Sequence, residues 1–244
     1  MDDIIQKTIQ DTLLDNINQE YVTLPSSKEQ GKNLKKIITK TDIIEMDQRF
    51  RANFVNSLTG FKPLNLVGTK SSAGQTNLAI ISSVVHLGSS PALFGFVFRP
   101  DSSPRHSLLN IRETGFCTIN HVNCNILKKA HQTSARYPKE VSEFEACGLS
   151  ESYEGGFYAP YVEESNIKIG LKIVDEIKIQ LNETHLVIGQ VEYVSIPEPS
   201  LTDGGFVDIH NAESICGAGL DSYYKTEKLA RLAYAKPDKK TEEI

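Results

Sequence analysis

Residues 167–181 read IKIGLKIVDEIKIQL, and this stretch decides the fold class. Apolar side chains occupy every second position on both sides of Asp175 and Glu176, which is the period of a strand with one buried face. A second apolar segment, residues 186–196, follows the turn-forming residues 182–184. We therefore predict a long antiparallel hairpin, with a break in the first strand near Asp175.

Shorter segments on either side of this hairpin predict more strands and a few short helices. Four apolar runs predict strands over residues 64–69, 77–86, 93–98 and 116–122. Helical patterns cover residues 42–54, 107–113, 125–135 and 140–147. The order lacks regular strand–helix alternation, and the sequence holds no GxGxxG motif, so a doubly wound parallel sheet is disfavoured. A mainly β protein, an antiparallel barrel with peripheral short helices, fits best.

The N-terminal part differs in character from the rest. Apolar residues in 1–20 recur with helical spacing, and a polar, lysine-rich stretch follows up to residue 40. We predict two parts: an N-terminal helix with a polar linker over 1–40, and the barrel domain over 41–244.

Composition limits the class of protein. The chain has 244 residues, of which 39% are hydrophobic and 23% charged, which argues against a disordered, collagen-like or coiled-coil chain. Its net charge is −5 and no dense basic stripe occurs, so we expect no nucleic-acid partner. No apolar run approaches the ~20 residues that a spanning helix needs. The acidic start, Met1-Asp2-Asp3, is unlike a signal peptide. We expect a cytoplasmic protein with no membrane partner.

The motifs of metal and hydrolase sites are missing. The four cysteines form no CxxC pair, and the HxxC pair His121–Cys124 has no second pair at similar spacing, so no metal site is expected. No Gly-x-Ser-x-Gly motif occurs, and no pattern joins a nucleophile to a base. We therefore assign no catalytic acid or base.

Polar residues concentrate in two segments beside apolar strands, 69–83 and 98–107. In the second, Arg105, His106 and Ser107 come at the predicted start of a helix. Unpaired N–H groups and the positive end of the helix dipole favour an anion there, and the arginine guanidinium adds several N–H donors in one plane. This pattern fits a phosphate site, and it equally fits an ordinary N-cap serine in a surface loop.

The order and spacing of several short pieces make the chain resemble a known family. The pieces are Asn77-Leu78-Ala79 with Ser82, Ser90-Pro91, Ser107-x-x-x-Ile111, Gly115-Phe116, Ile119-Asn120, Thr133-Ser134-Ala135, Tyr137-Pro138, Ser142-Glu143-Phe144 and Gly148-Leu149. With them, residues 49–237 resemble the flavin reductase-like, FMN-binding split-barrel family. The resemblance implies a six-stranded antiparallel split β-barrel and a homodimer with FMN at the subunit interface.

The resemblance also implies site residues. The cofactor-binding set would be Thr69, Asn77, Leu78, Ala79, Ser82, Ser83, Phe98, Arg99, Pro104, Arg105, His106, Ser107 and Asn120. The nicotinamide substrate, NADH or NADPH, would meet His131, Arg136, Tyr137 and His185. The family often has threonine at the place of Ser107. Many members carry a histidine five residues before a late glycine, whereas here Thr184 stands five before Gly189 and the histidine follows at 185.

The leading interpretation is an FMN-binding flavoprotein, an NAD(P)H-dependent reductase that passes hydride to flavin and electrons on to a flavin or another acceptor. Three alternatives stay open: an FMN electron carrier fed by a protein partner, a barrel for another ligand, and a haem-binding split barrel using His121, His131 or His185. Residues 154–158 are either a lid over the flavin or a loop packed at the dimer edge.

Overall fold

The computed structural model describes residues 35–100 and 105–244. The chain divides into two units, Met1–Met46 and Asp47–Ile244. The helix expected over residues 1–20 and most of the linker lie outside the described residues. The described part of the first unit holds α2 (Lys40–Glu45), which begins at a capping box between Thr39 and Asp42.

The second unit begins with α3 (Gln48–Ser57). A single helix was predicted over 42–54, whereas the structure has two. The second one starts afresh because the Asp47 carboxylate accepts hydrogen bonds from the N–H groups of Arg49, at 2.9 Å, and Phe50, at 3.2 Å. Met46 before it has an extended backbone and ends the first helix.

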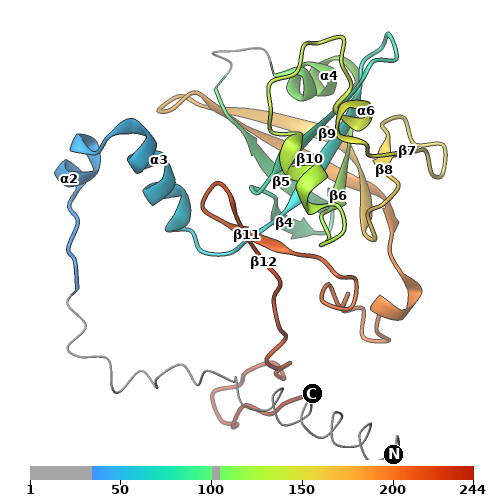
Figure 1. Ribbon diagram of the computed structural model, residues 1–244. Coiled ribbons are helices and arrows are strands. Elements are labelled where there is room, and N and C mark those ends of the chain that lie inside the picture. Colours follow the sequence, from blue (N-terminus) through green and yellow to red (C-terminus); the bar gives the residue numbers. More distant parts are fainter. Residues whose placement is uncertain (1–34, 101–104) are drawn as a thin grey trace, which may run out of the picture. The chain divides into compact units, whose positions relative to one another are not determined.

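One antiparallel sheet dominates the second unit (Figure 1), as the alternating pattern predicted. In spatial order its seven strands are β3 (Thr76–Ile81), β2 (Asn65–Lys70), β6 (Phe116–His121), β9 (Lys168–Ile179), β10 (Thr184–Ser195), β5 (Ala92–Phe98) and β4 (Val85–Ser89). The β9–β10 hairpin is the predicted one. It has two irregularities: the one near the predicted break is a bulge at Val174, because Ile188 pairs with Asp175 and the next residue, Gly189, pairs with Ile173, and the other lies between Val191 and Tyr193.

The sheet is rolled up, and its connectivity shows why. The two edge strands, β3 and β4, are joined by the three residues Ser82–Val84. Seven flat strands would put these edges about 29 Å apart. A connection of this length reaches at most about 14 Å. The sheet must therefore curl until its edges meet at this link.

The same link explains the strand count. A single strand over 77–86 and a barrel of six strands were expected, whereas the main sheet has seven strands because that run divides at Ser82–Val84. The Ser83 hydroxyl donates to the Val97 carbonyl, at 3.2 Å, and accepts from the Val97 N–H, at 3.0 Å. This side chain thus takes the place of a ladder bond where the backbone turns from one edge to the other.

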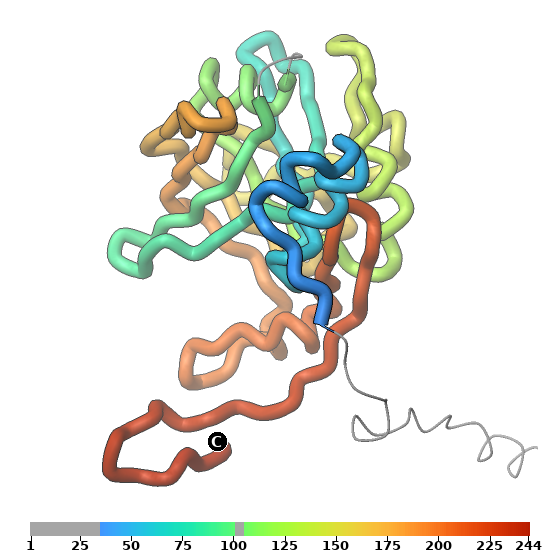
Figure 2. Tube along the Cα trace, turned by 90° about the vertical axis from the view of Figure 1, so that its left-hand side faces the viewer, coloured from blue at the N-terminus to red at the C-terminus, as the bar shows by residue number. Residues whose placement is uncertain are grey.

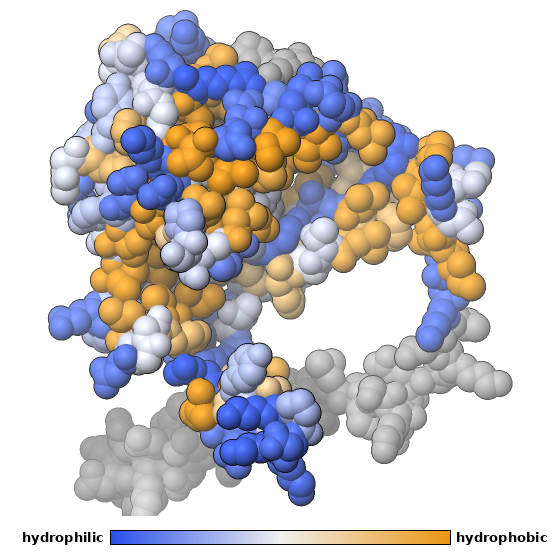
Figure 3. Space-filling view, turned by 180° about the vertical axis from the view of Figure 1, so that it is seen from behind, coloured by the Kyte–Doolittle hydropathy of each residue, from blue (hydrophilic) through white to orange (hydrophobic). Residues whose placement is uncertain are grey.

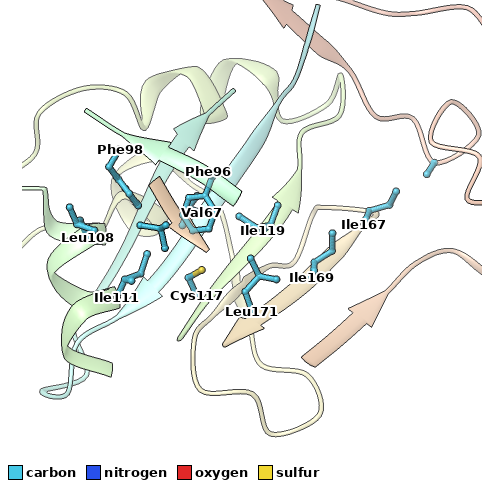
Figure 4. Close-up of a cluster of buried hydrophobic side chains, with 12 residues drawn as sticks. Val67, Phe96, Phe98, Leu108, Ile111, Cys117, Ile119, Ile167, Ile169 and Leu171 are labelled. Atoms are coloured by element: carbon cyan, nitrogen blue, oxygen red, sulfur yellow. The ribbon is translucent and has the colours of Figure 1, made fainter. Parts of the chain in front are cut away.

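Two apolar clusters form the core. The interior of the rolled sheet holds the first, drawn in Figure 4, which includes Val67, Phe96, Ile119 and Leu171, all fully buried. The second lies outside β2 and β3, beneath α5 (Leu127–Gln132) and α6 (Glu143–Cys147). The sheet approaches its covering loops closely at Gly68, where a Cβ atom would lie 2.3 Å from the Pro160 carbonyl oxygen.

Smaller elements complete the unit. They are α4 (His106–Thr114), η1 (Glu198–Ser200), the pair β7 (Glu151–Ser152) and β8 (Tyr161–Val162), and a small sheet of β1 (Lys62–Pro63), β11 (Cys216–Ala218) and β12 (Ser222–Tyr224). Helix α4 ends, as predicted, at Gly115, whose φ is 77°. After β12 the chain runs away from the barrel as an extended tail (Figure 2). None of the helices in the described residues is both long and apolar enough to cross a membrane.

Candidate functional site

A groove of about 670 Å³ opens along the link between β3 and β4. This volume is within the ~300–1,000 Å³ typical of small-molecule sites. Its walls come from β3, the end of β5, the start of α4, residues 131–143 and the β11–β12 hairpin. The groove therefore lies where the edges of the rolled sheet meet.

Most of the predicted site residues line this groove. Of the cofactor-binding set, the groove brings together Asn77, Ala79, Ser82, Ser83, Phe98, Arg99, Arg105, His106 and Ser107. Of the substrate set it holds His131, Arg136 and Tyr137. Residues from 77 to 137 thus converge on one site although they come from two strands, two helices and their loops.

Five predicted residues are not brought there. Pro104 lies outside the described residues. Thr69 and Leu78 are buried in the sheet beneath the groove wall. Asn120 is also fully buried, and its amide is used inside the protein: Nδ2 donates to the Leu66 carbonyl, at 3.1 Å, while Oδ1 accepts from the Val162 N–H, at 3.0 Å. The reason is that β6 lies inside the sheet, between β2 and β9, and both of its faces are buried over residues 117–120.

His185 belongs to a separate ionic cluster. Its Nδ1 lies 2.7 Å from a carboxylate oxygen of Glu176, which also pairs with Arg112 at 2.5 Å. The hydrogen bond from Arg112 holds the pKa of the Glu176 carboxyl below its usual value. This cluster joins α4 to the β9–β10 hairpin, so His185 has a structural setting away from the groove.

The start of α4 forms one end of the groove. Within residues 35–100 and 105–244 no side chain caps the helix, so none of these residues occupies its first N–H groups. Arg105 stands at the N-cap position, and its Nε is enclosed without a hydrogen-bond partner in the described part of the chain. An enclosed, unpaired guanidinium N–H is costly. Together with the helix dipole, it makes this end of the groove suitable for an anion.

The outer edge of β3 forms a second wall and is covered by the segment that follows α5. The N–H of Ile80 donates to Thr133 Oγ1, at 3.0 Å, and the N–H of Leu78 donates to Glu143 Oε2, at 3.0 Å. Residues 133–143 are thereby attached to β3 at both ends. Between these attachments, Arg136 and Lys139 reach the groove as exposed cations.

The charge of the groove differs from that of the whole chain. Its described lining carries four cations, Arg99, Arg105, Arg136 and Lys139, against two carboxylates, Glu143 and Asp221. The chain as a whole has a net charge of −5. A cationic groove in an acidic protein favours ligands with phosphate or carboxylate groups.

Sequence reasoning missed the contribution of the β11–β12 hairpin. Tyr223 on β12 hydrogen-bonds Nδ1 of His131 on α5, and their rings meet edge to face with centroids 5.7 Å apart. Gly217, Gly219 and Asp221 line the groove beside them. The late residues carry no local pattern that marks a site, and long-range contacts such as the pairing of β11 with β1 bring them there.

Residues 154–158, predicted as a lid or a packed loop, do not line the groove. Glu154 forms an ion pair with the buried Lys168, at 2.6 Å. The Tyr158 hydroxyl donates to the Ser71 carbonyl, at 2.9 Å, and the Lys70 ammonium lies over its ring, 4.6 Å from the centroid. The loop is thus held against β2 and β9 by its own contacts.

Comparisons with known proteins agree with this architecture. The model of the Flavin reductase like domain matches residues 61–210. A split-barrel protein of known structure from Shewanella frigidimarina NCIMB 400, assigned as a flavin reductase, is 46% identical with a TM-score of 0.80, covering 82% of this chain and 100% of that one. Flavoredoxin of Desulfovibrio vulgaris (Miyazaki F) is 23% identical with a TM-score of 0.61, over 73% and 92% of the two chains. An uncharacterised protein of Halalkalibacterium halodurans is 29% identical, over 59% of this chain and 72% of its own.

Proposed function

The chain belongs to the Flavin reductase like domain family, and from this premise we propose that it binds FMN in the groove and reduces it with NADH or NADPH. The electrons would pass on to a second flavin or another acceptor. The observation that carries the proposal is the enclosed Nε of Arg105 beside the start of α4, where no described residue pairs with this N–H or caps the helix. It supports a phosphate site at one end of the groove, whose volume of about 670 Å³ is in the range of small-molecule sites.

The residues of the groove fit FMN in chemistry as well as in size. Arg105 and the N–H groups of α4 would hold the phosphate, while Ala79 and Phe98 provide apolar surface for the ring. The Ser82 hydroxyl makes no hydrogen bond in the described part of the chain and lines the groove, so it can serve the polar edge of the ring. FMN, when bound, supplies the redox chemistry, and the protein needs no strong acid or base.

The nicotinamide dinucleotide would use the outer part of the groove. Its phosphates are anionic, and Arg136 and Lys139 are exposed on the segment that borders the opening. His131, fixed by Tyr223, lies on the same side. These side chains support binding of a nicotinamide dinucleotide in the outer part of the groove, and the experiment below compares NADH with NADPH.

The absorption spectrum tests the proposal. We expect protein incubated with FMN and freed of excess ligand to show flavin bands. These bands should bleach under anaerobic conditions on addition of NADH or NADPH, because the proposed reaction transfers a hydride from the nicotinamide to the bound flavin. Each nucleotide is added to a separate sample, and free FMN with the same nucleotide is the control.

Two other results would change the assignment. Bands that persist with both nucleotides and disappear with dithionite would contradict the reductase and favour an FMN electron carrier supplied by a protein partner. A protein that takes up no FMN would contradict flavin binding itself.

We also propose a homodimer with the flavin at the subunit interface. Large apolar side chains are exposed on the edge strand β4, at Val85 and Leu87, and on β9, at Val174 and Ile177. Figure 3 shows apolar side chains gathered at the surface of the barrel. Such patches on a protein of this size are typical of interaction sites.

Light scattering tests the dimer and should give a mass twice the chain mass of 27.1 kDa. A monomer mass with FMN bound would contradict the dimer.

A further inference from the structure

Glu143 is a buried carboxylate in the wall of the groove. It opens α6, keeps 5% of its surface accessible, and lies in the groove lining. Buried carboxylates are rare unless their oxygens are satisfied. The hydrogen bonds of this residue therefore indicate what it does.

The protein uses one of the two carboxylate oxygens. Oε2 accepts from the Leu78 N–H, at 3.0 Å, and also from Nδ2 of Asn77. Oε1 accepts no hydrogen bond within residues 35–100 and 105–244, although the residue borders the groove. The internal bonds thus hold the carboxyl group in place and leave its second oxygen available to a ligand in the groove.

The neighbouring amide is fixed by the same carboxylate. A carboxylate only accepts, so the Asn77 amide must turn its NH₂ toward Glu143. The Asn77 carbonyl oxygen then faces Ser107, whose hydroxyl donates to it at 3.3 Å. Both Glu143 and Asn77 therefore present acceptors on this side of a groove whose other charged residues are mostly cations.

We propose that Glu143 is a flavin-binding residue, and that its Oε1 accepts a hydrogen bond from an N–H or O–H group of the bound flavin. This inference rests on the proposed function. An isoalloxazine carries an imide N–H, and the ribityl chain carries hydroxyl groups, so FMN offers donors as well as its phosphate. The cationic end of the groove selects the phosphate, and Glu143 selects a neutral donor in the rest of the ligand.

Substitution by glutamine separates this role from a structural one. Oε2 is contacted by two N–H donors, so the amide introduced by E143Q must place its oxygen inward and its NH₂ toward the groove. The inner bonds and the fold are kept, whereas the groove gains a donor where it had an acceptor. A donor of the flavin would then face another donor, which costs binding energy.

The experiment measures FMN affinity by quenching of flavin fluorescence, and the unfolding temperature of the apoprotein, for the wild type and E143Q. Glu145→Gln is the matched control, because Glu145 lies on the same helix and is exposed. We expect E143Q to weaken FMN binding about 10- to 100-fold, with an unfolding temperature close to that of the wild type and E145Q. A second variant, E143L, removes both oxygens and should lower the unfolding temperature as well.

The outcomes distinguish the two proposals. If E143Q binds FMN as tightly as the wild type, Glu143 only covers the edge of β3, and the inference is wrong while flavin binding stands. If the wild type binds no FMN, the proposed function fails and the inference fails with it. Weaker binding by E143Q accompanied by an equal loss in E145Q would also overturn the inference, because the effect would then be one of overall charge.

Discussion

FMN binding should weaken roughly 10- to 150-fold when Arg105 is replaced by alanine, the loss expected for a hydrogen bond to a charged group. The Nε of this arginine is enclosed at the start of α4 and has no hydrogen-bond partner among the residues that the structure describes. A phosphate there would receive charge-assisted bonds from the guanidinium, which are among the strongest that a side chain makes. Removing the side chain leaves the phosphate to the helix N–H groups alone.

Riboflavin provides the ligand control for this variant, because it lacks the phosphate. Its affinity should be the same in R105A and in the wild type, as measured by fluorescence quenching in the same buffer. Arg49→Ala is the protein control, since Arg49 is exposed on α3 and does not line the groove. An equal loss of FMN and riboflavin affinity in R105A would show that Arg105 supports the fold and does not hold the phosphate.

Acid should destabilise the protein through His121. This side chain is half-buried on β6, its Nδ1 lies 2.9 Å from Ser214 Oγ, and burial lowers its pKa from 6.5 to about 4. Above pH 6.5 the ring is neutral in both the folded and the unfolded state, so it adds no pH dependence. Below pH 6.5 the unfolded state takes up a proton that the folded state refuses. The free energy of unfolding should therefore fall as the pH drops from 6.5 to 4, by up to about 3 kcal/mol.

Urea unfolding at pH 7.0, 5.5 and 4.5 measures this dependence. In His121→Asn, which keeps a polar group near the position of Nδ1 and cannot titrate, the decrease between pH 7.0 and 4.5 should be smaller by most of this amount. The control is His86→Asn, because His86 is exposed on β4. If H121N and the wild type lose the same stability on acidification, other groups cause the loss.

Local patterns predicted the framework well. The alternation in residues 167–181 indicated the β9–β10 hairpin, because side-chain period is a local property of a strand. Gly115 likewise marked the end of α4, because a left-handed C-cap favours glycine. The segment 77–86 could not be divided in the same way. Its turn at Ser83 depends on bonds to Val97, fourteen residues along the chain and on another strand.

The prediction of the groove residues from the sequence had a similar limit. Arg105, His106 and Ser107 were predicted together because they are adjacent at a helix start. Asn120 has the right chemistry for a flavin, but its place on β6 turns it into the packed structure, and no single residue type reveals that. The β11–β12 hairpin reaches the groove through pairing with β1, more than 150 residues earlier in the chain, and its sequence alone carries no sign of this.

The link Ser82–Val84 has a mechanical consequence. The edge strands β3 and β4 do not pair with each other in the described part of the chain; the backbone joins them at this link, and the Ser83 hydroxyl attaches the link to Val97 on β5, so the wall there lacks the continuous ladder that stiffens the other sides. A barrel with such a seam can widen along one line while its remaining strand pairs keep their register. Because Ser82 and Ser83 also line the groove, a ligand in the groove would lie along this unpaired line of the barrel. The width of the groove can therefore adjust to its occupant at little cost to the core.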